Sequence, residues 1–374
     1  MNWWRRFRSV ALGLVLLMAA GCVGGHSRSA PAGSPTPAMS GLSTARAPGL
    51  FYAVVDARDG AVEAVSVRTG KVVREVAPAQ RDGMSEAGVT SAGGHWLLVT
   101  YSRGPQCTSG VAGCGPRPHT CGAEVIRVDV RTGDSILLWR VGRDELLRSA
   151  ALSPDGNLLA ARASPCIPSY FNDHLVIRRL STGESWTIGA RVARCHWIGN
   201  PQWTEDSSHL VFTFAPPASP KPYTGADGTC ASFGDNELVN IDALHPAGSI
   251  TGSSLPPRHS CTWDAIATDG AKMYVVEACG HDSGRLDGPV NLVQLSETLK
   301  PLRTWSLGRC TDGDSVAADQ TAGVLIATYL FCNPPPKGQK LRSPITVLDH
   351  LQHGRLHRIA TAPGGNTAWD DLAW

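Results

Sequence analysis

The sequence lacks most of the motifs that would identify an enzyme or a nucleic-acid-binding protein. It contains no Gly-x-Ser-x-Gly elbow, no His-Glu-x-x-His pair and no Gly-x-x-x-x-Gly-Lys loop. Hydrolase or kinase chemistry that depends on these motifs therefore has no support. The net charge is only +2 and no run of Lys and Arg follows the first eight residues, which argues against nucleic acid as a partner.

Long apolar stretches are also missing, apart from one near the N-terminus. A basic segment, Met1–Arg8, precedes an apolar run, Val10–Ala20, and the small residue Gly21 stands before Cys22. This is the layout of a secretory signal, and the run is shorter than the roughly 20 apolar residues that a membrane span needs. We therefore expect residues 1–21 to be a signal peptide that is removed.

The end of this segment, Met18-Ala19-Ala20-Gly21-Cys22, resembles the lipobox of bacterial lipoproteins. The resemblance implies cleavage before Cys22 and lipid on its thiol, although Ala19 stands where the family most often has Leu. Lipid on Cys22 would place the protein on the extracytoplasmic face of a cell membrane. The alternative is an ordinary signal peptide followed by an incidental cysteine. Residues 23–47, rich in Gly, Ser, Pro, Ala and Thr, predict a disordered tether that begins at the lipidated residue 22.

Short alternating or apolar runs fill residues 48–374, and two kinds of polar turn separate them. Hairpins of the first kind turn at residues 67–70, 130–133, 180–183, 247–248, 297–298 and 352–354. A second kind precedes each of the last five, at residues 92–94, 153–156, 205–207, 268–270 and 319–321. Four strands per period, repeated, predict an all-β fold, the β-propeller.

The two ends of the chain predict how this ring closes. Three strands are expected near residues 50–56, 61–67 and 71–76, and one unpaired strand near residues 368–374. Joining the last strand to the first three completes a sixth blade and removes the exposed edges of an open ring. Residues 153–160 and 201–206 resemble the repeats of TolB-like and WD-type propellers, a resemblance that implies the fold and a tendency to bind partners, but no reaction.

Eleven cysteines are present without any Cys-x-x-Cys pair, and setting Cys22 aside leaves an even number for disulfides. In the predicted blades these ten cysteines all fall on one rim. Cys261 and Cys279, like Cys310 and Cys332, are placed symmetrically about a hairpin turn, which predicts that each pair is bonded. The same logic pairs Cys195 with Cys230. Cys166 is then expected to join one of Cys107, Cys114 and Cys121, and the other two to pair together.

Three carboxylates are candidates for a site in the central channel. Alignment of the innermost strands on their turns places Asp264, Asp314 and Asp370 at one equivalent position in neighbouring blades. Converging oxygen ligands suit Ca²⁺ or a similar hard cation. The alternative is that each carboxylate accepts hydrogen bonds from an adjoining loop and locks the blades together.

Histidine and tryptophan provide weaker candidates. His350, His353 and His357 could chelate a transition metal, although solvated turn histidines are the simpler interpretation. Four tryptophans could stack on a sugar or anchor a protein, or fill the gaps between blades: Trp197, Trp203, Trp263 and Trp369.

Two functions from different classes follow from these patterns. The first is a membrane-anchored lipoprotein whose propeller presents its disulfide-rich rim to a protein or glycan, without catalysis. The second is a metal-dependent propeller enzyme, similar to a lactonase or a sugar dehydrogenase, that uses the acidic channel. A third possibility is that the propeller is only a stable spacer in an assembly.

Overall fold

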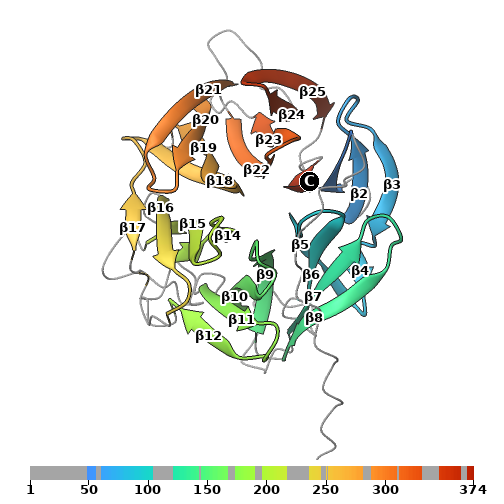
Figure 1. The fold of residues 1–374 in the computed structure, drawn as a ribbon. Coiled ribbons are helices and arrows are strands. Elements are labelled where there is room, and N and C mark those ends of the chain that lie inside the picture. The colour runs from blue at the N-terminus through green and yellow to red at the C-terminus, as the bar shows by residue number, and fades with distance from the viewer. Residues whose placement is uncertain are drawn as a thin grey trace, which may run out of the picture. The chain divides into compact units, whose positions relative to one another are not determined.

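Polar turns between short apolar strands produce a six-bladed β-propeller, in which six separate sheets surround a central channel (Figure 1). In the computed structural model the described residues are 49–55, 60–103, 121–142, 145–166, 173–189, 196–216, 236–245, 250, 252–280, 288–309, 311–330, 345–363 and 369–374. All of them belong to the compact unit Pro37–Trp374. No helix in these ranges is long and apolar enough to cross a membrane.

Blade 1 combines the two ends of the chain, as the sequence predicts. Its order is β26-β1-β2-β3, so the C-terminal strand is innermost and pairs antiparallel with β1. The strands are β26 (Asp370–Ala373), β1 (Leu50–Val55), β2 (Ala61–Ser66) and β3 (Val72–Ala77). This pairing closes the ring because it leaves no gap between the first blade and the last.

Blades 2 and 3 follow in chain order, each with its first long strand nearest the channel. Blade 2 contains β4 (Gln80–Arg81), β5 (Met84–Ser91), β6 (Trp96–Arg103), β7 (Gly122–Asp129) and β8 (Ser135–Val141). Blade 3 contains β9 (Glu145–Leu152), β10 (Leu158–Pro165), β11 (His174–Arg179) and β12 (Ser185–Ile188). The two-residue strand β4, which pairs with β5, was not expected from the sequence.

Blade 4 has a divided innermost strand. It contains β13 (Trp197–Ile198), β14 (Gln202–Trp203), β15 (His209–Ala215), β16 (Glu237–Asp242) and β17 (Ser253–Leu255). Both β13 and β14 pair with β15, so together they occupy the place of one strand.

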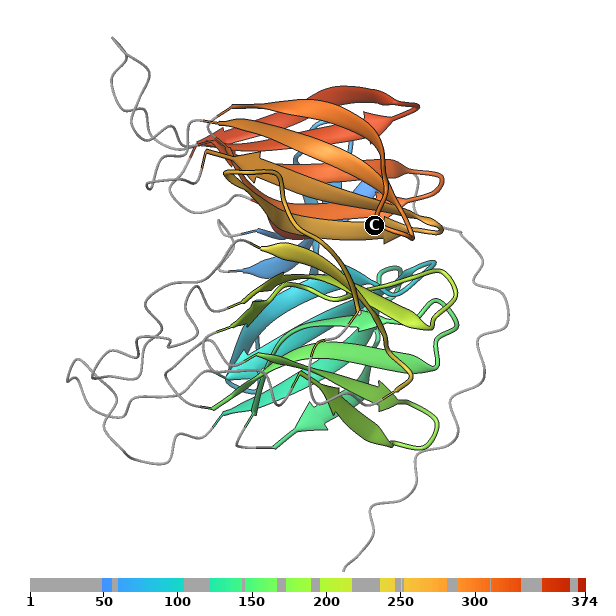
Figure 2. The same cartoon turned by 90° about the vertical axis from the view of Figure 1, so that its left-hand side faces the viewer.

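Blades 5 and 6 are regular four-stranded sheets. Blade 5 contains β18 (Cys261–Asp269), β19 (Lys272–Cys279), β20 (Pro289–Ser296) and β21 (Pro301–Arg309). Blade 6 contains β22 (Thr311–Asp319), β23 (Gly323–Leu330), β24 (Ile345–Gln352) and β25 (Arg355–Pro363). A view turned by 90° shows the twist of the strands within these sheets (Figure 2).

The turns are fixed by local hydrogen bonds of short polar side chains. In the turn of blade 3 Asp155 Oδ1 accepts hydrogen bonds from Ser153 Oγ at 2.5 Å and from the Asn157 amide at 3.1 Å. Asp206 accepts in the same manner from Thr204 Oγ1 at 2.6 Å in blade 4. Ser, Thr, Asn and Asp favour turns because their side chains form hydrogen bonds with nearby backbone groups. The repeated turns are therefore visible in the sequence.

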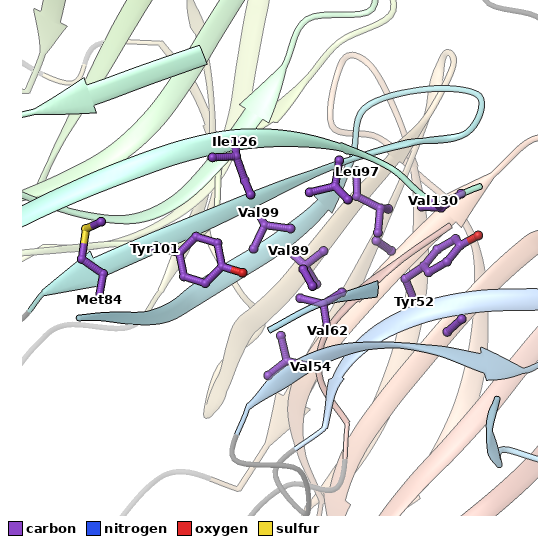
Figure 3. Packing of buried hydrophobic residues seen from close by; sticks show 14 residues of the cluster. Tyr52, Val54, Val62, Met84, Val89, Leu97, Val99, Tyr101, Ile126 and Val130 are labelled. Carbon is purple, nitrogen blue, oxygen red and sulfur yellow. The ribbon is translucent and has the colours of Figure 1, made fainter. Parts of the chain in front are cut away.

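The apolar core is divided into six clusters, one at each junction between neighbouring blades. Figure 3 shows the cluster between blades 1 and 2, where Tyr52, Val54 and Val62 face Val89 and Val99. Burial of apolar area therefore holds each blade to its two neighbours. The side chains that face the channel are not needed for this packing between blades.

Candidate functional site in the channel

A β-bulge interrupts the innermost strand of five blades at nearly the same step. The strand register shifts once in each of β5, β9, β18, β22 and β26. One extra residue results in four of these strands: Ala87, Arg148, Asp314 and Asp371. In β18 two residues, Asp264 and Ala265, lie opposite the single residue Val276. A bulge bends its strand and re-aims side chains.

Blade 4 contains the same insertion in a different form. Ile198 of β13 faces Phe214, whereas Gln202 of β14 faces Val211. Three residues, 199–201, therefore lie opposite two residues of β15. Asn200 is in the centre of this irregular segment, so all six blades change register next to the channel.

Side chains from all six blades surround one cavity at this level of the channel. Its volume is about 360 Å³. The lining residues are Val89, Thr90, Arg162, Trp197, Asn200, Gln202, Asn236, Asp264, Ala265, Ile266, Ser315, Val316, Asp371 and Leu372. Further along the innermost strands a second cavity, of about 130 Å³, is lined mainly by apolar and small residues. Polar groups therefore gather in the larger cavity.

Arg162 of β10 is the cation of this cavity, and Asp173 holds it in place. Arg162 Nε donates to Asp173 Oδ2 at 2.9 Å, and only 15% of the Arg162 side chain is exposed. Asp173 is fully buried and also accepts from Ser164 Oγ at 2.7 Å and from the Ile198 amide at 3.3 Å. Burial lowers the pKa of the Arg162 guanidinium, and the charge of Asp173 acts in the opposite direction.

Trp197 lies against the same guanidinium. The Arg162 Cζ atom is 5.1 Å from the centroid of the Trp197 ring, a distance typical of a cation–π contact. Asp173 and Trp197 together restrict the orientation of the arginine. The Arg162 guanidinium therefore lines the cavity in a fixed orientation.

Asp371 combines an uncommon backbone conformation with a raised pKa. Its φ of 31° is positive, which is uncommon for a residue other than glycine. The Val89 amide donates to its carboxylate, and Asn200 Nδ2 lies 3.4 Å from Oδ1. Burial nevertheless raises the pKa of Asp371 to about 6, because the charged form loses its hydration.

Gly88 allows this close approach of blades 1, 2 and 3. A Cβ atom at residue 88 would lie 3.0 Å from the Arg148 carbonyl oxygen and 3.1 Å from Asp371 Oδ2. A side chain would therefore be crowded at the point where the bulges of β9 and β26 meet β5, which favours glycine at residue 88.

The carboxylates named from the sequence are placed as follows. Asp264 lines the cavity, whereas Asp314 and Asp370 lie in β22 and β26 with side chains outside the described atoms. The register aligns Asp314 with Asp371 instead of Asp370, because each is the extra residue of its bulge. The Ca²⁺ hypothesis for Asp264, Asp314 and Asp370 stays a prediction.

Sequence reasoning missed most of the polar residues of the cavity, among them Arg162, Asn200 and Asp371. Arg162 left a signal, since it is the one charge in the otherwise apolar Leu158–Ala163 segment, and buried charges need partners. Asp371 follows a candidate directly and was missed by one position. Asn200 has no comparable signal, because its place depends on the division of β13 from β14.

Two disulfides confirm part of the predicted pairing. Cys261 is bonded to Cys279, and Cys166 is bonded to Cys121, which selects one of the three partners left open for Cys166. The remaining predicted pairs include Cys107, Cys114, Cys195, Cys230, Cys310 and Cys332, all outside the described residues. Glu277 lies close to Cys261 and Cys279, but their sulfur atoms are bonded to each other and are not free thiolates.

Most of the tryptophans fill space between blades, as one of the two interpretations predicts. Trp203 and Trp263 are buried, and their Nε1 atoms donate to the carbonyl oxygens of Ala151 and Leu255 at 3.0 Å. Trp369 is buried as well, and only Trp197 of the four lines the cavity.

The three histidines do not form a common site. His353 and His357 are exposed, whereas His350 is buried and its Nε2 lies 2.7 Å from the Ala322 carbonyl oxygen. The expectation of solvated turn histidines is therefore wrong for His350. His350 lies opposite His357 in the register of β24 and β25, and its ring lies against Trp374.

No family model and no curated protein matches this chain. Many solved structures are similar to it at low identity. An oligogalacturonate lyase in complex with manganese is 13% identical, with a TM-score of 0.43, and the match covers 80% of this chain and 70% of that one. A protein of unknown function from Bacteroides caccae is 13% identical, with a TM-score of 0.44 and coverage of 87% and 97%.

A third similar structure is the β-propeller domain of the trilobed protease from Pyrococcus furiosus. It is 10% identical, with a TM-score of 0.40, and the match covers 74% of this chain and 72% of that one. Likenesses of this degree say nothing about chemistry.

Proposed function

We propose that this protein is an extracytoplasmic lipoprotein, held at the membrane by lipid on Cys22, whose propeller binds a glycan in the channel cavity. The supporting observation is the convergence of polar side chains from all six blades on one cavity of about 360 Å³. This volume is within the range of small-ligand pockets, about 300 to 1,000 Å³.

The chemistry of the lining favours a sugar over a peptide. Sugar hydroxyls both donate and accept, and the amides of Asn200, Gln202 and Asn236 can do the same. Asp264 and Asp371 add acceptors. A bound peptide would need apolar pockets for its side chains, whereas most of the residues that line this cavity are polar.

A titration with a panel of neutral and charged oligosaccharides tests glycan binding. Gln202→Ala is the informative variant, since this residue lines the cavity from β14. Gln352→Ala, at the end of β24 and outside the cavity lining, is the matched control. We expect binding by the wild type and the control, with loss of affinity in Gln202→Ala. Equal affinity in all three would exclude the channel as the glycan site.

Membrane attachment is tested separately. Growth of expressing cells with labelled palmitate should label the wild type, and Cys22→Ala should remain unlabelled. If Cys22→Ala still incorporated the labelled palmitate, the proposed anchor would be wrong, whereas the proposal for the channel would be unaffected.

The metal-dependent enzyme has one supporting observation, since Asp264 and Asp371 line the same cavity. It predicts that added Ca²⁺ raises the thermal stability of the wild type. Replacement of Asp264, Asp314, Asp370 and Asp371 by Asn should abolish that increase. The binding-module proposal predicts no such increase, so the two functions give opposite results in one experiment.

A further inference from the structure

We propose that the glycan residue in the channel carries a carboxylate and that Arg162 binds it. This inference rests on the proposed glycan-binding function and names the class of sugar: a hexuronate or another acidic sugar.

The first step of the argument is the orientation of the guanidinium. Nε is committed to Asp173 at 2.9 Å, and among the described residues this is the only group that accepts a hydrogen bond from Arg162. Arg162 also lines the cavity, so its Nη atoms are the donors that remain for a ligand. Two parallel N–H groups match the two oxygens of a carboxylate.

The second step concerns the support behind the arginine. Asp173 is fully buried and receives hydrogen bonds from Ser164 Oγ and the Ile198 amide in addition to Arg162. The His196 ring also contacts the Asp173 carbonyl oxygen. A buried residue with this many contacts cannot follow the arginine if it moves. Arg162 is thus preorganised, and a ligand loses little free energy in fixing it.

The third step is the balance of charge. Arg148, the bulge residue of β9, and Asp371 both lie near enough to Arg162 to interact with it electrostatically. Two guanidinium groups and two carboxylates therefore share this side of the channel, and Asp173 is the carboxylate hydrogen-bonded to Arg162. Asp371 is tied to the Val89 amide and to Asn200, and Asp264 comes from blade 5. These two carboxylates suit sugar hydroxyls, and Arg162 suits the acidic group.

The experiment compares three ligands on the purified protein: glucuronate, its methyl ester and glucose. The ester keeps the shape of the acid and removes its charge, so no substitution in the protein is needed. We expect glucuronate to bind about tenfold more tightly than both neutral sugars, the increase ordinarily associated with a charge-assisted hydrogen bond. Equal binding of acid and ester overturns this inference but leaves glycan binding intact. Absence of binding by all three overturns both proposals.

Two further measurements locate the carboxylate. Arg162→Lys keeps the charge beside Asp173 and loses the planar pair of donors, so we expect it to fold and to reduce the preference for acid over ester. An unchanged preference would place the carboxylate elsewhere and overturn the role of Arg162. An acetylated dipeptide with a free carboxyl end is the competing ligand, and tighter binding of this peptide than of glucuronate would overturn the assignment to an acidic sugar.

Discussion

Asn200 and Asp371 meet beside the channel although 171 residues separate them in the chain, with Asn200 Nδ2 3.4 Å from Asp371 Oδ1. One residue comes from the divided strand of blade 4 and the other from the strand that closes the ring. Asp371 also accepts a hydrogen bond from Val89 of blade 2. A single carboxylate therefore links three blades, and its ionisation affects the stability of the fold.

Replacement of Asp371 by Asn should stabilise the protein at neutral pH. The pKa of Asp371 is about 6 in the folded state against 3.8 ordinarily, so between these values the folded chain binds more protons than the unfolded chain. The free energy of unfolding of the wild type therefore falls as pH rises from about 4 to 6. Asp371→Asn removes this fall, and its advantage should reach up to about 3 kcal/mol at pH 7. Urea unfolding at pH 4, 5, 6 and 7 measures it.

Asp206→Asn provides a control of opposite sign. Hydrogen bonds from Ser208 and Thr204 hold the pKa of Asp206 far below its usual range. Its contribution is therefore present at neutral pH and lost as pH falls through its folded pKa, so this variant should be destabilised at pH 7. Equal stability of Asp371→Asn and wild type at pH 7 would contradict the buried state of the carboxyl group.

A methyl group at residue 88 should distort the channel. In Gly88→Ala the new Cβ would press on the Arg148 carbonyl oxygen and on Asp371 Oδ2, at 3.0 and 3.1 Å. Overpacking of this kind typically costs about 1 to 3 kcal/mol. Gly142→Ala is the matched control, since no atom lies within 4 Å of its Cβ position and residue 142, like residue 88, has no positive φ. We expect loss of glycan binding in Gly88→Ala only. If Gly88→Ala bound the glycan as tightly as the wild type, displacement of Asp371 would have no effect on binding.

The fold could be predicted because each blade repeats local signals. Turns such as Ser153-Pro154-Asp155-Gly156 have side chains that bond their own backbone, and these are readable without tertiary context. The closing strand could be predicted because each blade has four strands and the N-terminal segment supplies only three. The cavity could not be predicted to the residue, because a bulge shifts every later side chain by one position. Asp371, the extra residue of the bulge in β26, is one example.

The two disulfides should differ in their contributions to stability. Cys121–Cys166 joins residues 45 positions apart and connects blade 2 to blade 3, whereas Cys261–Cys279 joins residues 18 apart within blade 5. Loop entropy gives roughly 4 kcal/mol for the first and roughly 3 kcal/mol for the second, as upper values. The double variants Cys121→Ser/Cys166→Ser and Cys261→Ser/Cys279→Ser can be compared by urea unfolding. If removal of Cys261–Cys279 lowered the free energy of unfolding more than removal of Cys121–Cys166, the disulfide between blades 2 and 3 would not be the more stabilising one.

Closure of the ring should depend on Trp374. Its indole is buried in the cluster between blades 6 and 1, and Nε1 donates to the Ala317 carbonyl oxygen at 3.2 Å. Its backbone is held by Ser91 of blade 2, whose Oγ accepts from the Trp374 amide at 2.9 Å and donates to the Trp374 carbonyl at 3.0 Å. Trp374→Ala should therefore destabilise the fold by about 3 to 5 kcal/mol.

Trp305→Ala is the matched control for this loss. Trp305 also donates through Nε1 to a neighbouring blade, at the Gly354 carbonyl oxygen, but it lies on the outermost strand β21 and is only partly buried. We expect a smaller loss there, because less apolar area leaves water when Trp305 folds into place. Thermal unfolding of both variants decides the matter. If Trp305→Ala were as damaging as Trp374→Ala, the ring would depend equally on all its blade junctions and closure by β26 would have no special weight.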